Sequence, residues 1–372
     1  MTVIRAFTIH FPKSREKSTF NFLELNFSRY CPPLLDVKGK LKLNVFTNRV
    51  VLPPILEFKN ILGENSLSHL SRQLEDFLDD YGVDIAAIPI EGAYSYLKNV
   101  SEALRETEKI YFSFNVGGLS DYPSRIDLRS VVKTLREIGR VAGQDAFTRI
   151  AFTYGKTPVT PYFPATTSRK PGLSLSLLYA SQLKNVVEKG GDLRDEMRRI
   201  LVNFSKLGVN VSKDLDLMFL GVDASISPWM ENSVANLIEA MISDRFGSPG
   251  TYHAIFNLNS LIEQVSNGLK TTGFNEVMLP LAEDNWLKNA VREGRLKIED
   301  FVSYISVCVA GLDMTPIPSN VSDDKLIKVV RDVVSISHVK KRTVGVRLIL
   351  VNANSGEEVK LEKFGKTPVL SI

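Results

Sequence analysis

Hydrophobic positions along this 372-residue chain follow two alternating patterns, one typical of buried strands and one of amphipathic helices. Short apolar runs such as Val3–Ile9, Val83–Ile90 and Leu215–Val222 predict strands. Between such runs, apolar residues recur every three or four positions, as over Ser66–Tyr81, and predict helices. Further strands are expected over Lys40–Val51, Lys109–Val116, Arg149–Tyr154, Leu173–Leu178, Asn275–Pro280, Cys308–Ile317, Thr343–Val351 and Glu358–Leu361.

About ten strands that are mostly separated by helices predict an α/β fold. Strands with apolar residues on both faces are typical of a parallel sheet covered by helices. No shift in composition and no flexible linker divides the chain, so we expect one α/β domain over 1–372. The segment Gly155–Pro171, rich in proline and threonine, is too long for a routine connection and is interpreted as a functional loop.

Charge and composition exclude several classes of protein. The chain has 46 basic and 42 acidic residues, a net charge of +4, without a basic stripe interleaved with aromatic residues, so we expect no nucleic acid. No apolar stretch is long enough to cross a membrane and no targeting segment is visible, which predicts a cytoplasmic protein. With only Cys31 and Cys308, neither a disulfide framework nor a structural zinc site is expected.

Acidic residues stand at the ends of several apolar runs. Asp223, Glu283, Asp284 and Asp313 do so in the second half of the chain, and Glu91 does so in the first. In a parallel sheet such acids would collect at one edge, where α/β proteins place their sites, so the four later acids are candidate catalytic residues. Glu91 is a candidate substrate-binding residue.

Clustered carboxylates need protons, basic partners or a divalent cation to coexist. Asp223, Glu283 and Asp313 are therefore also candidate metal ligands. Oxygen donors favour Mg²⁺, Mn²⁺ or Ca²⁺ over zinc, and we expect Mg²⁺ or Mn²⁺. The alternative for each acid is a helix N-cap, a role that Asp284 fits well.

Other polar residues could face the same site. Asn115 ends a predicted strand, Tyr162 and Phe163 lie in the proline-rich loop, and Thr251 and His253 open a predicted helix. We take these five as candidate substrate-binding residues, although His253 also fits a structural role. Cys308 is a candidate nucleophile, with an inert core cysteine as the alternative. No Walker loop or dinucleotide fingerprint is present, so neither ATP nor NAD is expected.

Several motifs of the second half resemble a known family. They are Gly221-Val222-Asp223-Ala224-Ser225, Leu279-Pro280-Leu281-Ala282-Glu283-Asp284, Cys308-Val309-Ala310-Gly311-Leu312-Asp313, Thr343-Val344-Gly345-Val346-Arg347 and Phe364-Gly365-Lys366-Thr367-Pro368-Val369. Together with the loop at Tyr162, they are similar to the domain of unknown function 711 family, also called uncharacterised protein family 0210. The resemblance is close over residues 148–372, whereas 1–147 form a divergent N-terminal half.

The resemblance implies a fold more than a reaction. The family is grouped with pyruvate formate-lyase, so we expect a single ten-stranded α/β barrel. Glycyl radical machinery is not expected, because Gly345 lies inside a predicted strand and no adjacent cysteine pair is present. Relatives also suggest a regulatory partner of the amino-acid-sensing ACT type, and a barrel of this kind implies a homo-oligomer.

Two hypotheses follow from the sequence. In the first, the protein binds or transforms a small polar metabolite at an acidic rim formed by strand carboxyl ends. In the second, it is a non-catalytic, ligand-binding regulatory protein that works with an ACT-type partner. The sequence does not decide between an enzyme and a sensor.

Overall fold

The computed structural model describes residues 2–13, 15–58, 67–90, 94–156, 158–162, 171–309 and 312–372. In these residues nine strands form one large mixed sheet in the order β7-β6-β1-β2-β3-β4-β5-β9-β8, and β10 pairs with β11 in a separate hairpin. The strands are β1 (Val3–His10), β2 (Val45–Val51), β3 (Ile85–Pro89), β4 (Ile110–Asn115), β5 (Ile150–Tyr154), β6 (Gly172–Leu178), β7 (Met218–Asp223), β8 (Leu312–Pro318), β9 (Val344–Val351), β10 (Glu358–Leu361) and β11 (Gly365–Pro368).

The sheet consists of two sets of strands that run in opposite directions. Strands β1 to β5 are parallel and lie side by side in sequence order. Strand β6 pairs antiparallel with β1, and β9 pairs antiparallel with β5. Because β7 is parallel to β6 and β8 is parallel to β9, these four strands run against the first five. The α/β class and a mostly parallel sheet are thereby confirmed.

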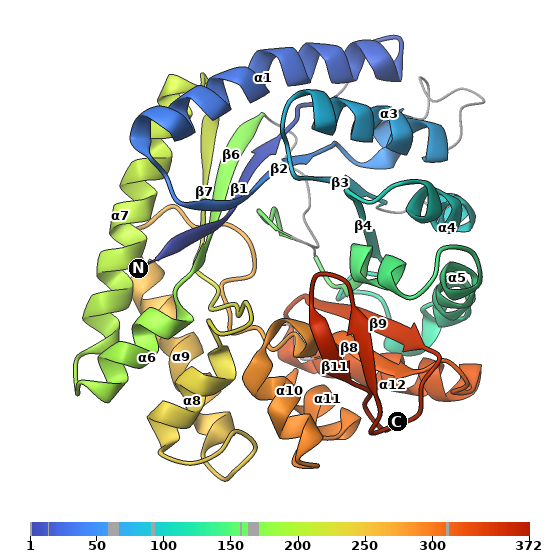
Figure 1. The fold of residues 1–372 in the computed structure, drawn as a ribbon, viewed down its shortest axis with the longest axis vertical. Coiled ribbons are helices and arrows are strands. Elements are labelled where there is room, and N and C mark those ends of the chain that lie inside the picture. Colours follow the sequence, from blue (N-terminus) through green and yellow to red (C-terminus); the bar gives the residue numbers. More distant parts are fainter. Residues whose placement is uncertain are drawn as a thin grey trace.

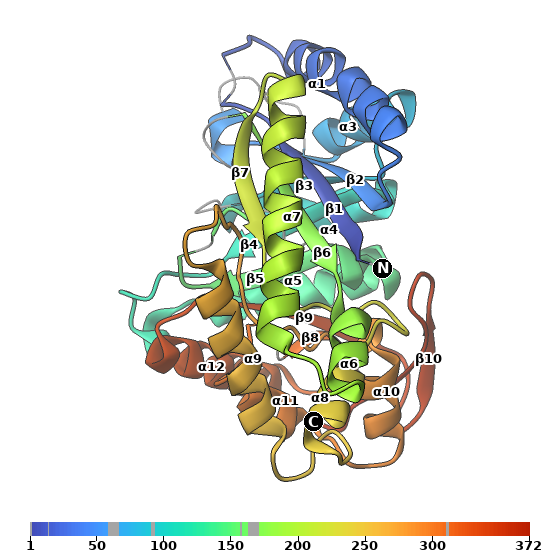
Figure 2. The ribbon, with the colours of Figure 1, turned by 90° about the vertical axis from the view of Figure 1, so that its left-hand side faces the viewer.

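Helices surround the sheet on its outside, and in Figure 1 they form an outer ring around the strands. They are α1 (Thr19–Leu41), α3 (Leu67–Asp80), α4 (Leu97–Glu106), α5 (Leu128–Val141), α6 (Ala180–Glu188), α7 (Leu193–Asp214), α8 (Val234–Ile242), α9 (Thr251–Ser266), α10 (Asn285–Arg292), α11 (Ile298–Tyr304) and α12 (Asp323–Lys340). Figure 2 shows α7 running along β6 and β7 for most of their length. No helix in the described ranges is both long enough and apolar enough to span a bilayer.

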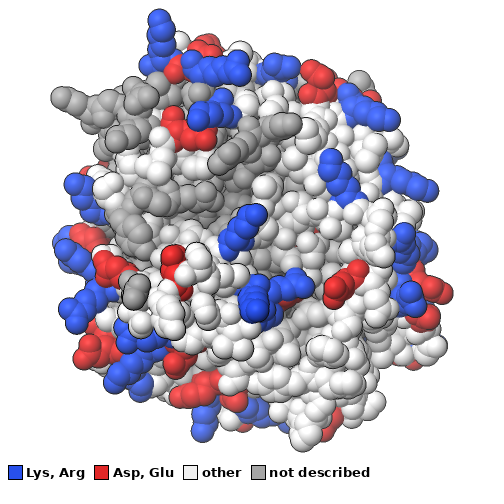
Figure 3. All heavy atoms as spheres, turned by 180° about the vertical axis from the view of Figure 1, so that it is seen from behind, with Lys and Arg blue, Asp and Glu red and all other residues white. Residues whose placement is uncertain are grey.

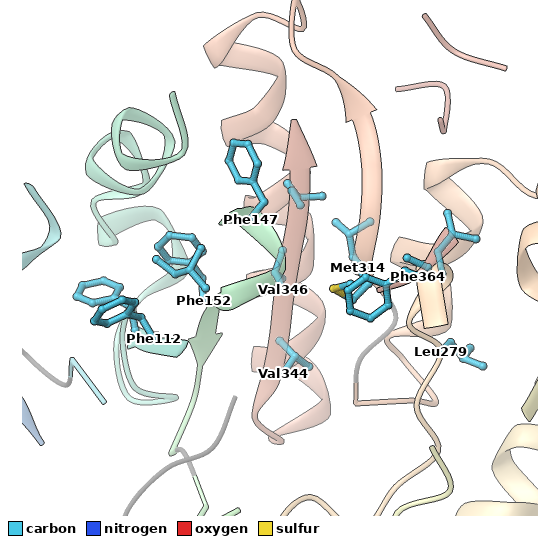
Figure 4. Close-up of a cluster of buried hydrophobic side chains, with 14 of the residues drawn as sticks. Phe112, Phe147, Phe152, Leu279, Met314, Val344, Val346 and Phe364 are labelled. Carbon is cyan, nitrogen blue, oxygen red and sulfur yellow. The ribbon is translucent and has the colours of Figure 1, made fainter. Parts of the chain in front are cut away.

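The two faces of the sheet differ in polarity. Alternate side chains such as Phe112, Phe114 and Phe152 belong to the main hydrophobic core beneath the helices, part of which is drawn in Figure 4. Their neighbours Tyr111 and Ala151 point to the other face and form a separate small cluster. Side chains alternate in direction along a strand. The helix-facing positions are therefore apolar, whereas the inner face holds small and polar residues.

The sheet curves strongly, and its edge strands approach one another. Lys270 and Thr272 exchange backbone hydrogen bonds with Val222 of β7, and the N–H of Val309, just before β8, donates to Val277. The segment 270–278 therefore contacts both edges. It makes isolated bridges rather than a regular ladder, so the predicted strand over Asn275–Pro280 is wrong.

Irregular backbone explains that difference. Gly273 and Asn275 both have positive φ, at 80° and 53°, which interrupts an extended strand. The segment also bonds to several neighbours in turn, because Gly273 N–H donates to Val159 and Met278 N–H to Ile226. A closed ten-stranded ring is not confirmed in the described residues, in which eleven strands occur in all.

Helix α1 was not predicted from the sequence. Ser18 caps it by accepting a hydrogen bond from the N–H of Asn21, and Phe22, Phe27 and Leu34 are fully buried on one side. The consecutive prolines after Cys31 argue against a helix interior, because proline removes a backbone donor and clashes with the preceding turn. The apolar spacing was the stronger signal, because the buried face stabilises the helix despite the prolines.

Candidate functional site

Three arginines project from apolar strands onto the inner face of the sheet. Arg5 lies in β1, Arg49 in β2 and Arg347 in β9, and their exposed fractions are 6%, 7% and 6%. Arginine is rarely buried this deeply unless it is paired. The inner face therefore concentrates positive charge where the outer face holds hydrocarbon.

Glu283 connects two of these arginines across the sheet. It lies at the end of a short 3₁₀ turn, η5 (Leu281–Glu283), and is 3% exposed. One carboxylate oxygen accepts a hydrogen bond from Arg5 Nη2, and the other accepts one from Arg347 Nη2 at 3.1 Å. Four strands separate β1 from β9 in sheet order, so the curvature of the sheet is what places both arginines against one carboxylate.

Asp313 completes this buried network. It pairs with Arg347 through two parallel hydrogen bonds, one from Nε and one from Nη2, the latter at 2.7 Å. Arg5 Nη1 also donates to the carbonyl of Pro228 at 2.8 Å, and the Arg5 guanidinium lies 5.2 Å from the ring centre of Tyr162. Bidentate arginine–carboxylate geometry fixes orientation as well as charge. The network is therefore a preorganised arrangement of side chains.

The two carboxyl groups differ in their preference for protons. Burial raises the pKa of Glu283, but Arg5 and Arg347 outweigh it, and the net pKa is below its usual range. Asp313 is shifted the other way: burial raises its pKa, Arg347 opposes this, and the charge of Glu283 adds to the rise. Burial alone would lower the pKa of Arg347, yet both carboxylates together raise it. Environments that separate two carboxyl pKa values in this way suit one group to carry charge and the other to exchange protons.

A cavity of about 570 Å³ adjoins the network on the inner face, and we call it the inner cavity. Arg5, Arg49, Glu283 and Arg347 line its buried end. Its aromatic lining residues are Phe46, Tyr111, Tyr162, Trp229 and Phe364. Its exposed charged lining residues are Asp84, Glu108 and Lys363, and Lys109 is half-buried. A smaller void of about 20 Å³ shares Arg5, Tyr162, Glu283 and Arg347 with the inner cavity and is also lined by Asp313.

Aromatic rings form one wall of the inner cavity. Trp229 stands between Phe46 and Phe364, with ring centres 5.0 and 5.6 Å away. Phe364 belongs to the turn between β10 and β11, and its carbonyl accepts a hydrogen bond from the buried Lys288 at 2.7 Å. Burial, reinforced by the nearby Arg292, lowers the pKa of Lys288 to about 8. The C-terminal hairpin therefore contributes directly to the cavity wall.

Arg49 differs from the other two arginines. Its Nε donates to Thr47 Oγ1 at 2.8 Å, and that hydroxyl in turn donates to the carbonyl of Arg5 at 2.8 Å. Within the described ranges its two Nη atoms have no hydrogen-bond partner, and the residue lines the inner cavity. Burial, and then the neighbouring charge of Arg5, lower the pKa of Arg49 to about 10. Arg49 is thus a buried cation without a counter-ion of its own.

The structure does not gather the predicted acids at one edge of the sheet. Asp223 does end β7, but Glu283 follows an irregular segment, and Asp313 is the second residue of β8 rather than its end. Because β7 and β8 run in the same direction, Asp223 and Asp313 lie toward opposite ends of their strands. Glu283 and Asp313 come together inside the sheet, against arginines. Five basic residues and three acidic residues line the inner cavity, so its excess charge is positive.

Asp223 holds backbone rather than facing the cavity. It is fully buried, and its carboxylate accepts hydrogen bonds from the N–H and hydroxyl of Ser225 and from the N–H groups of Phe274 and Asn275. Burial raises its pKa, and these hydrogen bonds oppose the rise. It fixes the irregular segment that approaches β7. It is not among the residues that line the inner cavity.

Asp284 is the helix cap that the sequence offered as the alternative. Its carboxylate accepts hydrogen bonds from Trp286 N–H and Leu287 N–H at the start of α10. It also accepts from Ser233 Oγ and from the N–H groups of Val234 and Ala235 at the start of α8. One buried carboxylate therefore serves two helix N-termini.

The other candidates occupy varied positions. Cys308 is fully buried in the main core, and Asn115 bonds to the backbone of Gly155 and Gly117. Thr251 fixes the turn before α9, and His253 is exposed on that helix, beside Asn257. None of these residues lines the inner cavity.

Tyr162 is the candidate from the proline-rich loop that does line the inner cavity. It is 4% exposed, and burial raises its pKa well above the usual value. Glu91 and Phe163 lie outside the described residues.

The three proposed metal ligands do not form a donor set. Among the residues that the structure describes, no group of three or more His, Cys, Asp or Glu side chains is placed to hold a metal ion. Asp223 is engaged by backbone N–H groups, and Glu283 and Asp313 by guanidinium groups. The guanidinium groups already occupy the carboxylate oxygens that would bind a metal ion. These three side chains therefore do not fit a site for Mg²⁺ or Mn²⁺.

Sequence reasoning missed the three arginines. The available signal was a charged residue inside an apolar strand, as in Ile4-Arg5-Ala6 and Val346-Arg347-Leu348. Such a residue faces either solvent at a sheet edge or a buried site. Local sequence does not distinguish these outcomes, because the answer depends on which strands flank it.

Comparison with known proteins agrees with the resemblance noted from the motifs. A family model described as Uncharacterised ACR (DUF711) matches residues 21–362. A UPF0210 protein of Pyrobaculum aerophilum is 26% identical, over 94% of this chain and 84% of its own length. UPF0210 proteins of Sulfurisphaera tokodaii and Carboxydothermus hydrogenoformans are 22% and 25% identical, over 95% and 91% of this chain and 83% and 82% of their own lengths.

Proposed function

The chain belongs to the DUF711 family, and from that premise we propose that it binds a small polar metabolite in the inner cavity. The observation behind this proposal is the cavity of about 570 Å³ whose buried end is lined by charged side chains held in fixed geometry. Its volume lies within the range of small-molecule sites, which combine apolar walls with a few precisely placed polar groups. Trp229, Tyr111 and Phe364 supply such walls.

The charged network suits orientation of a polar ligand. Arg5 and Arg347 are fixed by their shared carboxylate, so they lose little freedom when a ligand arrives. Glu283, with its lowered pKa, is a fixed anion at neutral pH. Asp313, with its raised pKa, is the better proton carrier of the two. A catalytic version of the proposal would use Asp313 as its acid–base group from the small void, because Asp313 lines that void and not the inner cavity.

A non-catalytic version of the proposal remains the alternative. A regulatory protein would use the same cavity to sense a metabolite and pass the signal to an ACT-type partner. Asp313→Asn separates the two versions, because it abolishes turnover in an enzyme but changes only ligand affinity in a sensor. Arg29→Gln, a change in an exposed ion pair, is the matched control.

We also propose that the sheet corresponds to the barrel of the pyruvate formate-lyase group. Two sets of parallel strands that meet antiparallel support this, as does the sharing of Glu283 by β1 and β9. The segment 270–278 would fill the gap between the edge strands β7 and β8. A homo-oligomer remains part of the proposal, and native mass spectrometry reports its mass directly.

Filling the inner cavity tests the binding function. Ile85 lines the cavity from β3, so Ile85→Trp places a large ring inside it. Val339→Trp adds the same ring on α12 at a position 82% exposed and is the control. Native mass spectrometry after exposure to a metabolite extract should show a retained small molecule in the wild type and in Val339→Trp, but not in Ile85→Trp. Retention by Ile85→Trp, or by none of the three, contradicts the proposal.

A further inference from the structure

We infer that the ligand of the inner cavity is a small organic oxyanion, a carboxylate or a phosphate ester, and that Arg49 is its anchor. This inference rests on the proposed function and narrows it to one chemical class. It starts from the charges at the buried end of the cavity. Arg5 and Arg347 share Glu283, and Arg347 also holds Asp313, so these two cations face two carboxylates. Arg49 is the third cation and has no carboxylate partner within the described ranges.

Arg49 is held in place for a ligand that approaches from the cavity. The hydroxyl of Thr47 accepts from Nε and is itself tied to the backbone of β1, which fixes one edge of the guanidinium. The opposite edge, with both Nη atoms, has no hydrogen-bond partner among the described residues. A guanidinium presents its donors as a planar fork that matches a carboxylate or a phosphate. The free edge of Arg49 is therefore shaped for an oxyanion.

The energetic argument points the same way. Arg49 is 7% exposed and forms no ion pair among the described residues, and a charge buried in this way is costly. The pKa of Arg49, lowered to about 10, reflects that cost. Arg5 Nε is also buried without a hydrogen-bond partner in the described residues. A bound oxyanion would compensate the positive charge that the protein itself leaves uncompensated here.

The cavity walls favour an organic anion over a bare inorganic one. Trp229, Tyr111 and Phe364 provide apolar surface within the same cavity. Free phosphate has no apolar part that could pack against this surface. The charged residues at its exposed end are mixed, with Asp84 and Glu108 beside Lys109 and Lys363, so they do not reverse the excess of positive charge. An organic oxyanion could pack its short carbon skeleton against the aromatic wall while its anionic group binds Arg49.

Ligand titration of the wild type and two variants tests the inference. Succinate and glycerol 3-phosphate are the oxyanion probes, glycerol and ethanolamine are the uncharged and cationic controls, and all are compared at matched ionic strength. Tryptophan fluorescence follows binding, because Trp229 lines the cavity. Arg49→Gln should weaken oxyanion binding roughly tenfold to a hundredfold, the value of one charge-assisted hydrogen-bonding group.

Arg149→Gln is the matched control, because both Nη atoms of Arg149 already donate to backbone carbonyls of Thr107 and Leu104. It should leave oxyanion affinity unchanged. Melting temperature supplies a second readout. Without ligand, Arg49→Gln should be at least as stable as the wild type, because it removes a buried unpaired charge. A merely structural role for Arg49 predicts a lower melting temperature instead.

The outcomes separate this inference from the proposed function. Oxyanion binding that depends on Arg49 supports both. Binding of glycerol or ethanolamine in preference to the oxyanions, or oxyanion binding that Arg49→Gln leaves unchanged, overturns the inference and leaves the proposed function standing. The inference is also overturned if neither oxyanion probe binds while the protein retains a metabolite that carries no anionic group; the proposed function then still stands. If neither the probes nor a metabolite extract yields a bound molecule, the proposed function itself fails.

Discussion

Arg347 should be the most sensitive position of the buried network, and Arg347→Met tests that expectation. The side chain is 6% exposed and pairs with both Glu283 and Asp313. After the substitution Glu283 keeps Arg5, but Asp313 has no other cation within ion-pair distance among the described residues. Removing one partner of a buried pair costs roughly 3–5 kcal/mol, mostly because the other charge stays buried. We expect that loss in the free energy of unfolding at neutral pH.

The loss should depend on pH in a defined direction. Burial already raises the pKa of Asp313, and without Arg347 this pKa rises further. The folded state then binds a proton that an unfolded aspartate, with a pKa of about 3.9, does not bind. The free energy of unfolding of Arg347→Met therefore falls as pH rises from the unfolded pKa of Asp313 to its raised folded pKa. The substitution should cost more stability at about pH 7 than at about pH 5. The lowered pKa of Glu283 contributes stability that is lost only below its unfolded value of about 4.3.

Urea denaturation followed by circular dichroism measures these quantities. Arg29→Met removes an arginine from an exposed ion pair with Asp216 and should cost no more than about 1 kcal/mol. Adding Asp313→Leu to Arg347→Met should recover at least part of the loss, because both buried charges of that pair are then gone. A loss below about 1 kcal/mol at neutral pH, an equal loss at both pH values, or no recovery in the double variant refutes the reasoning.

Three further predictions address residues with structural roles. Asp284→Ala should lower the free energy of unfolding by about 2–4 kcal/mol in urea titrations, since it removes caps worth about 1–2 kcal/mol each from two helices; a loss below 1 kcal/mol would show that the caps are dispensable. Gly273→Ala should lower the melting temperature far more than Gly143→Ala, because both have φ near +80° but only at Gly273 would a Cβ clash, with the Asp223 carboxylate. Cys31 and Cys308, both fully buried, should react with Ellman's reagent only after denaturation; rapid reaction of Cys308 in the native protein would contradict this and support the nucleophile hypothesis.

The charged side chains on one face of the molecule are of both signs. On the face drawn in Figure 3, Lys and Arg side chains are interspersed with Asp and Glu and with large uncharged areas. The expectation of no nucleic-acid partner stays a prediction.

The sequence by itself determined the class of the fold and most of its elements. Apolar runs such as Val3–Ile9 and Thr343–Val351 became β1 and β9 with nearly the predicted bounds, because burial on both sides leaves a local signature. It also offered the correct alternative for Asp284, since capping depends on residues close in the chain. Family membership likewise followed from short motifs.

Only the tertiary structure decided where the inner cavity lies and what its charge is. The strand carboxyl ends do not share one edge of the sheet, because β6 pairs antiparallel with β1 and β9 pairs antiparallel with β5. The residues of a single strand do not determine in which direction it pairs. The curvature that places Arg5 and Arg347 on one carboxylate joins residues 342 positions apart. Charge at a buried site is the sum over groups that only folding brings together. Of the four acids in the second half of the chain, Glu283 lines the positively charged inner cavity, whereas Asp223 and Asp284 hold backbone elsewhere.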